Sequence, residues 1–249
     1  MLLKLLLHLF FQICLAQTPS RMDALNEKLP KMNGPNCWNA ALYVTHLIES
    51  MRYSSPEELA FWLNSKYCKK IQDSEQIQAG DIVALRSHEG ELHAMLWLKD
   101  NMVFSKNTSH RLDPYQKIEA PLIFSMFRVN ESICQQPRSE YSQACSRWTD
   151  YYHCESSQAD RIRELNLNDE LRNFYEHSHR MNQQIEKIIF SGTPNSKDFD
   201  VLKLRLHDLQ TKMAADAKRK DTQISFFTKA LFHEAESLRV QIDLLKSPR

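Results

Sequence analysis

The spacing of hydrophobic residues changes twice along this chain of 249 residues, and these changes limit the folds open to it. Two helical segments come first, short apolar runs typical of β-strands follow, and helical spacing then continues to the end. The expected strands are 82–86, 91–99, 102–106 and 123–129. We therefore expect an α+β fold, in which two helices pack on a small antiparallel meander and a long helical hairpin with coiled-coil packing follows. A compact helical bundle packed on the first domain is the alternative.

Capping residues mark where the two expected helices of the first domain begin. Asn36 is expected to cap a helix that starts at Cys37 and ends near Ser50. Ser55 is expected to cap the second helix, with Pro56 in its first turn and Glu58 completing a capping box.

The first sixteen residues resemble a secretory signal, because a positive residue, Lys4, precedes an apolar stretch and small residues before Gln17. An uncleaved anchor is the alternative, although the stretch is short for a membrane span. The predicted division is a signal peptide at 1–16, an α+β domain at 17–130, a cysteine-bearing connector at 131–156 and a helical region at 157–249. We expect a secreted or periplasmic protein without a stable membrane span after cleavage.

The charges of the chain are nearly balanced, with 32 lysines and arginines against 31 aspartates and glutamates. This balance gives no electrostatic case for binding nucleic acid.

Five cysteines remain once Cys14 leaves with the signal, and an odd number in an exported protein indicates disulfides plus one free thiol. They are Cys37, Cys68, Cys134, Cys145 and Cys154. With Cys37 free, the other four can pair in three ways. The three after residue 130 cannot pair among themselves without leaving one over, so we expect Cys68 to bond to one of them. Zinc ligation with His153 is the competing interpretation, but the spacings lack a CxxC pair, and we expect no metal or cofactor.

Cys37 is the candidate nucleophile, because the stretch NGPNCWNAA puts it where a loop ends and a helix begins. The positive end of the helix dipole and free backbone N–H groups favour a thiolate there. A buried structural cysteine, or half of a disulfide, is the competing interpretation.

A cysteine nucleophile needs a base, and we expect His93 to supply it. The histidines of the first domain are His46, His88, His93 and His110. Only His93 stands near the start of an apolar strand, on the same face as Met95 and Trp97 by the two-residue period. A histidine on a core-facing strand beside the Cys37 helix has the geometry that a Cys/His pair requires. A buried core histidine with satisfied hydrogen bonds is the alternative.

The order of these features resembles the NlpC-type papain-like cysteine peptidases over about residues 33–129. NCWNAAL matches the nucleophile helix, AGDIVALR the strand before the histidine, and HAMLWLKDNMVFSKN the histidine hairpin. The resemblance implies Cys37 as the nucleophile and His93 as general base and later general acid. The family usually hydrolyses amide bonds in cell-wall peptides, and its relatives include amidases and acyltransferases.

The chain departs from this family at several site positions. Ser105 stands where the family often has a second histidine, and Asn107 lies on the same face, so either is a candidate to orient the imidazole. Asn33 or Asn36 is expected to supply an oxyanion donor beside the Cys37 backbone N–H. Trp38 follows the nucleophile, where serine or glycine is common in the family, and is expected to wall the substrate cleft.

Two functions follow as expectations. The first is an exported thiol hydrolase that cleaves a peptide or amide bond, with a peptide or peptidoglycan-like substrate. The second is a catalytically inactive papain-like scaffold whose helical hairpin binds a partner protein or a second copy of the chain.

Overall fold

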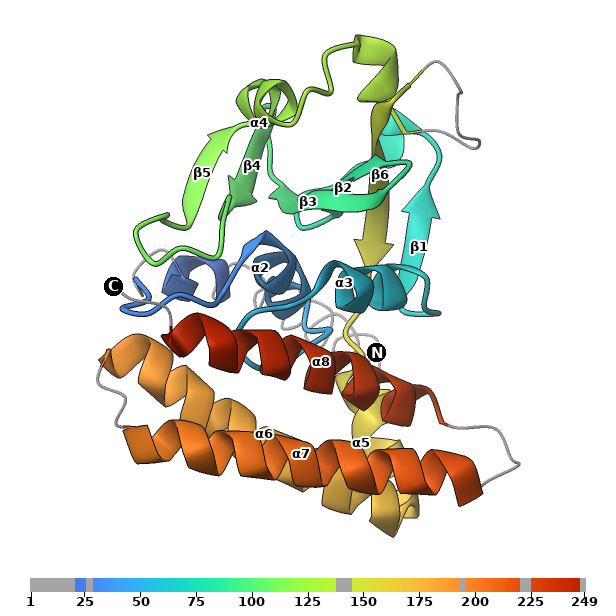
Figure 1. Ribbon diagram of the computed structural model, residues 1–249. Coiled ribbons are helices and arrows are strands. Elements are labelled where there is room, and N and C mark those ends of the chain that lie inside the picture. The colour runs from blue at the N-terminus through green and yellow to red at the C-terminus, as the bar shows by residue number, and fades with distance from the viewer. Residues whose placement is uncertain (1–20, 26–28, 138–144, 193–195, 220–224, 247–249) are drawn as a thin grey trace, which may run out of the picture.

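The computed structural model describes residues 21–25, 29–137, 145–192, 196–219 and 225–246. The predicted signal peptide at 1–16 lies outside these described residues. A six-stranded antiparallel sheet stands above a layer of long helices, with α2 and α3 between them (Figure 1). The chain is therefore mixed α and β, as its periodicity predicts.

The sheet has the strand order β1-β6-β2-β3-β4-β5, and each neighbouring pair is antiparallel. The strands are β1 (Cys68–Ile71), β2 (Ile82–Ser87), β3 (Gly90–Trp97), β4 (Met102–Ser105), β5 (Gln116–Glu119) and β6 (Arg147–Cys154). Strands β2, β3 and β4 lie where the sequence predicts them. The short helices η1 (Ser74–Gln76) and η2 (Ser132–Cys134) lie in the connections.

Helices cover both faces of the sheet. The helices α2 (Cys37–Val44) and α3 (Pro56–Leu63) pack on one face, where Ala84, Ala94 and Leu96 belong to their apolar cluster. The opposite face packs against α4 (Ala120–Met126) and the Cys134–Cys145 pair, and it carries Val83, Leu85 and Met95. Successive β-strand residues point to opposite faces, so the central strands β2 and β3 contribute residues to both clusters.

The capping signals correctly locate both helix starts, but the expected capping box is not formed, because the Ser55 N–H donates to the Ser237 hydroxyl rather than to Glu58. The Asn36 side chain accepts a hydrogen bond from the Asn39 N–H, and the Ser55 side chain accepts one from the Glu58 N–H. The α2 helix ends at Val44 rather than near Ser50. It ends early because His46, two residues after Val44, is left-handed with φ of 59°, a conformation that a right-handed helix cannot include.

The prediction of a strand over 123–129 is wrong, because residues 120–126 form α4. Pro121 occupies the first turn, where a missing N–H costs no helical hydrogen bond. The buried residues Ala120, Ile123 and Phe124 follow the three-and-four spacing of one helix face.

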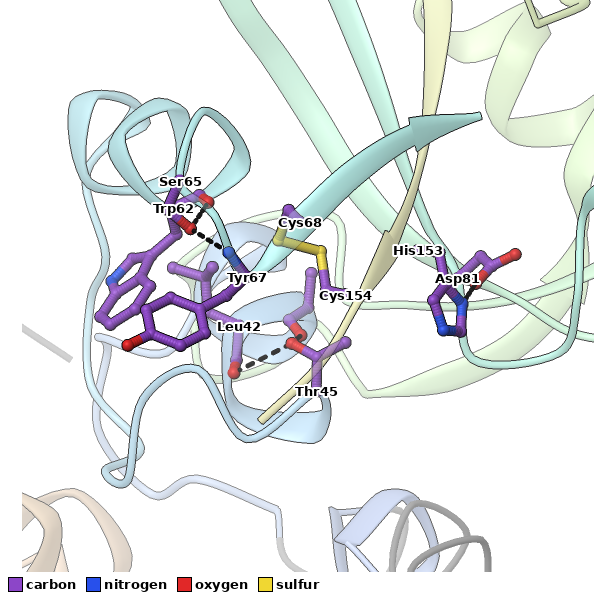
Figure 2. The surroundings of a disulfide bond; sticks show 10 residues. Leu42, Thr45, Trp62, Ser65, Tyr67, Cys68, Asp81, His153 and Cys154 are labelled. Atoms are coloured by element: carbon purple, nitrogen blue, oxygen red, sulfur yellow. Dashed lines mark hydrogen bonds and ion pairs between the residues drawn. A yellow bond between two sulfur atoms is a disulfide. The ribbon is translucent and has the colours of Figure 1, made fainter. Parts of the chain in front are cut away.

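The segment expected as a cysteine-bearing connector supplies β6, which is inserted between β1 and β2. A disulfide between Cys68 and Cys154 joins the start of β1 to the end of β6, as Figure 2 shows. Beside it, Nδ1 of His153 lies 2.8 Å from the buried carboxylate of Asp81. The second disulfide, Cys134–Cys145, closes a short loop and leaves Cys37 free. Both the expected pairing of Cys68 and the free Cys37 are confirmed.

The helical region is a compact bundle packed on the first domain. The alternative is therefore correct, and the expected long helical hairpin is not. The bundle comprises α5 (Gln158–Leu167), α6 (Asp169–Ser191), α7 (Ser196–Arg219) and α8 (Phe226–Lys246). The buried residues of α6 run from Leu171 to Ile189 along one face, as the helical spacing of this region predicts, and the helix ends at the left-handed Gly192 with φ of 73°. The α8 helix packs against α3, while α7 lies farther from the sheet (Figure 1).

Buried polar contacts join this bundle to the first domain. The fully buried Arg52 donates to both carboxylate oxygens of Glu58, at 2.8 and 2.6 Å, and to the Asn182 side chain on α6 at 3.1 Å. Ser237 on α8 donates to Glu58 at 2.7 Å and accepts from the Ser55 N–H at 2.9 Å. The bundle and the sheet domain therefore share an interior.

Within the described residues, no helix is both long enough and apolar enough to cross a membrane.

Candidate functional site

Cys37 occupies the first position of α2, as predicted, and its side chain is almost completely buried, with 5% of the residue exposed. Burial raises the pKa of the thiol to about 12, and it outweighs the backbone N–H groups of Ala94, Trp38 and Cys37, which lower it. The sulfur is therefore surrounded by the N–H groups that a thiolate would need. At neutral pH it nevertheless stays a thiol.

His93 lies on β3 and is fully buried. Its Nε2 is 2.8 Å from the Ser105 hydroxyl oxygen, and that hydroxyl donates to Oδ1 of Asn107 at 3.2 Å. Because the single hydroxyl proton goes to Asn107, the network assigns the imidazole proton to Nε2. Of the two candidate orienting residues, Ser105 therefore contacts the imidazole directly, and Asn107 holds the Ser105 hydroxyl.

The other ring nitrogen of His93, Nδ1, is buried and has no hydrogen-bond partner among the described residues. The ring stacks on Phe127, with ring centroids 4.4 Å apart. Burial lowers the pKa of His93 to about 3, so the imidazole is neutral at physiological pH. No thiol proton reaches Nδ1, and the Cys37–His93 hydrogen bond of a catalytic dyad is not formed.

The His93 side chain lies on the face of β3 opposite to the face that α2, the helix of Cys37, covers. The Ala94 side chain faces α2 and its neighbours, and its backbone N–H is among the groups that lower the pKa of Cys37. His93 points the other way, toward Phe127 and the cluster that contains Leu85, its partner on β2. His93 does share a face with Met95, as predicted, but α2 does not cover that face. On the opposite face of the sheet, the small side chains of Ala84 and Ala94 let α2 approach closely.

The expected oxyanion residues are committed to other contacts. The Asn36 amide donates to the Ser54 carbonyl at 2.8 Å while its Oδ1 caps α2. Oδ1 of Asn33 accepts from the Arg111 N–H at 3.0 Å. The Trp38 ring meets Tyr53 edge to face, with centroids 6.4 Å apart. The donors nearest the sulfur are therefore backbone N–H groups rather than these side-chain amides.

Lys106 is a residue near the site that the motifs of the sequence do not single out. It follows the last residue of β4, is fully buried and donates to the carbonyl oxygens of His110, at 2.7 Å, and of Asp113. Burial lowers its pKa to about 8, although the nearby charge of Asp113 raises it. The signal in the sequence is its place directly after Ser105, on the opposite side of the chain from His93 and so on the side of α2.

The cysteines considered for zinc are not available as thiolates, because Cys134, Cys145 and Cys154 are all in disulfides. In the part of the chain that the structure describes, no group of three or more His, Cys, Asp or Glu side chains could hold a metal ion.

Comparison with known proteins adds no relative to this picture: no family model matches the chain, and neither a curated protein nor a solved structure does.

Proposed function

We propose that this protein is a non-catalytic, exported scaffold of papain-like design whose helical bundle binds a partner protein. The observation that carries the proposal is that Nδ1 of His93 has no hydrogen-bond partner among the described residues, while its ring lies on the face of β3 away from α2, the helix of Cys37. A thiol hydrolase needs the imidazole within hydrogen-bond reach of the sulfur, and the arrangement here gives each group a different neighbourhood.

The protonation states support the same conclusion. With a thiol pKa of about 12 and an imidazole pKa of about 3, neither group is charged at neutral pH. Almost no thiolate is then present at pH 7, whereas an activated cysteine has a pKa below that of free cysteine. Burial therefore acts against catalysis on both members of the pair.

Two features support an exported binding protein. The two disulfides fit an oxidising compartment. The outermost helix, α7, leaves Val201 and Leu204 exposed at 41% and 70%, three residues apart on one helical face. An apolar pair at this spacing suits contact with a partner helix or with a second copy of the chain.

The test is hydrolysis of cell-wall peptide fragments by the full disulfide-bonded chain, with the products identified by mass spectrometry. We expect no products that depend on Cys37, so the wild type and Cys37→Ala should give the same spectrum. Hydrolysis by the wild type that Cys37→Ala abolishes would overturn the proposal. Sedimentation of the wild type and of Leu204→Ser then tests whether α7 mediates self-association.

A thiol hydrolase acting on a peptide or amide bond is the second candidate, and a specific observation favours it. Three backbone N–H groups surround the Cys37 sulfur, and the His93–Ser105–Asn107 series orients an imidazole whose Nδ1 carries no proton. These are the parts of a Cys/His site, although the thiol and the base do not meet. Under this candidate His93→Gln would also abolish hydrolysis.

A further inference from the structure

The connection between β4 and β5, residues 106–114, lies beside the segment that leads into Cys37; we call it the strap. Most of it is at the surface, and Leu112 is 71% exposed. Burial is confined to its two ends, at Lys106 and at the following residue, Tyr115. A segment that buries little apolar surface has low local stability, so its polar contacts decide whether it stays closed.

The amino group of Lys106 holds the strap from within. It donates to the carbonyl oxygens of His110 and Asp113 and lies 3.9 Å from the Asp113 carboxylate. That carboxylate in turn accepts from the Thr108 N–H, which closes the strap on itself. The ammonium group lies over the Tyr115 ring, 5.7 Å from its centroid. One buried cation therefore joins the middle and both ends of the strap.

The strap is bonded to the segment immediately before Cys37. The Gly34 N–H donates to the Ser109 carbonyl at 2.9 Å, and the Arg111 N–H donates to Oδ1 of Asn33 at 3.0 Å. On its other side, this segment accepts a hydrogen bond from Gln241 of α8 at the Asn33 carbonyl. The hydrogen bonds at Gly34 and Asn33 hold the strap against the chain three and four residues before Cys37, and the Asp113 carboxylate is among the groups that raise the pKa of that thiol.

We propose that the strap is a lid over Cys37 and that Lys106 is its lock. Opening requires the Lys106 amino group to leave the two carbonyls and the strap to release Asn33 and Gly34. Neither β3 nor the helical bundle has to move for this. The accessibility of Cys37 to a reagent in solution is then set by local opening of the strap, whether or not the thiol is catalytic.

The test is the rate at which iodoacetamide labels Cys37 in the native full chain with its disulfides intact, with the labelled peptide identified by mass spectrometry. We expect Lys106→Met to raise the rate about tenfold or more, because the strap loses the donor that holds two carbonyls. The matched control is Lys69→Met, an exposed lysine on β1, which should leave the rate unchanged. Asn33→Ala removes only the acceptor for Arg111 and should give a smaller increase.

The urea dependence of labelling separates local opening from unfolding. Local opening exposes little surface, so the labelling rate should depend only weakly on urea in the wild type, in Lys106→Met and in Asn33→Ala. Three results would overturn the proposal. The first is labelling of the wild type with the full urea dependence of global unfolding. The second is a rate for Lys106→Met within twofold of the wild type. The third is a larger increase in the labelling rate for Gln241→Ala than for Lys106→Met, which would mean that α8 rather than the strap covers Cys37.

Discussion

Burial decides the chemistry of the individual residues at this site. A cysteine at a helix N-terminus is commonly activated, because the dipole and the N–H groups favour the thiolate. At Cys37 these groups are present, yet desolvation is the larger effect and the pKa rises. His93 shows the same balance, since burial is the cause that lowers its pKa. Position in the sequence therefore identifies the groups, while depth in the fold sets their protonation.

The depressed pKa of His93 makes the folded protein sensitive to acid. Between about pH 6.5 and pH 3 the unfolded chain binds a proton at this residue and the folded chain does not, so stability falls as pH falls. From pH 7 to pH 4.5 this amounts to about 2–3 kcal/mol. Urea unfolding at the two pH values should show that much more loss in the wild type than in His93→Gln. An equal loss in both proteins would contradict the buried, neutral imidazole.

At the scale of elements, local signals identify where helices begin, and β2, β3 and β4 follow from their apolar runs. The caps at Asn36 and Ser55 involve residues adjacent in sequence, so the sequence alone is sufficient to predict them. Strand β6 is harder, because its pairing with β1 and β2 depends on residues far away in the chain. Aspartate is uncommon in strands, so Asp150 argues against one here. It is accommodated in β6, where it is buried, because it pairs with Arg86 on β2.

The candidate site shows the same limit. The sequence identifies Cys37, His93 and Ser105 and the face that His93 shares with Met95. It does not say which face of the sheet α2 covers, because that depends on how closely the helix can approach. The pair Ala84 and Ala94, opposite each other on β2 and β3, is the signal for the helix-covered face. Small residues permit that approach. Because successive residues of a strand point to opposite faces, His93, next to Ala94, then points away from α2.

A buried ion pair between Arg52, which precedes α3, and Glu58 on α3 lies where α3 meets Ser237 of α8, so breaking one side of it should be costly. Arg52→Met leaves Glu58, which is 1% exposed, without its positive partner and should destabilise the protein by about 3–5 kcal/mol. Arg52→Met/Glu58→Gln removes the unpaired charge and should recover part of that loss. Urea unfolding measures both variants. A double variant that is no more stable than Arg52→Met would show that the unpaired, buried charge of Glu58 is not what destabilises the Arg52→Met variant.

At the scale of the whole molecule, sheet and bundle form one interior. The apolar cluster on the α2 side of the sheet continues into the bundle, where it includes Leu171, Leu209 and Leu231. The buried network around Arg52 lies at the same junction. The helical region therefore belongs to the folded unit and offers a partner only its outer surface, on α7 and the exposed side of its neighbours.

The two disulfides should contribute unequally to the stability of this unit. Cys68–Cys154 joins residues 86 apart, whereas Cys134–Cys145 joins residues 11 apart. By the loop-entropy relation the long crosslink stabilises by about 4–5 kcal/mol and the short one by about 3 kcal/mol. Urea unfolding of Cys68→Ser/Cys154→Ser and Cys134→Ser/Cys145→Ser compares the two directly. A greater loss from the short loop would mean that native-state contacts, rather than restriction of the unfolded chain, dominate.

The protonation of Cys37 tests the central claim most directly. Thiolates absorb in the ultraviolet, so the difference in absorbance between the wild type and Cys37→Ser, followed from pH 6 to pH 11, titrates this thiol alone. A buried, non-catalytic cysteine with a pKa of about 12 predicts almost no thiolate at pH 9 and a signal still rising at pH 11. A complete transition with a midpoint at or below the free-cysteine value of about 8.5 would contradict the account and favour a thiol enzyme.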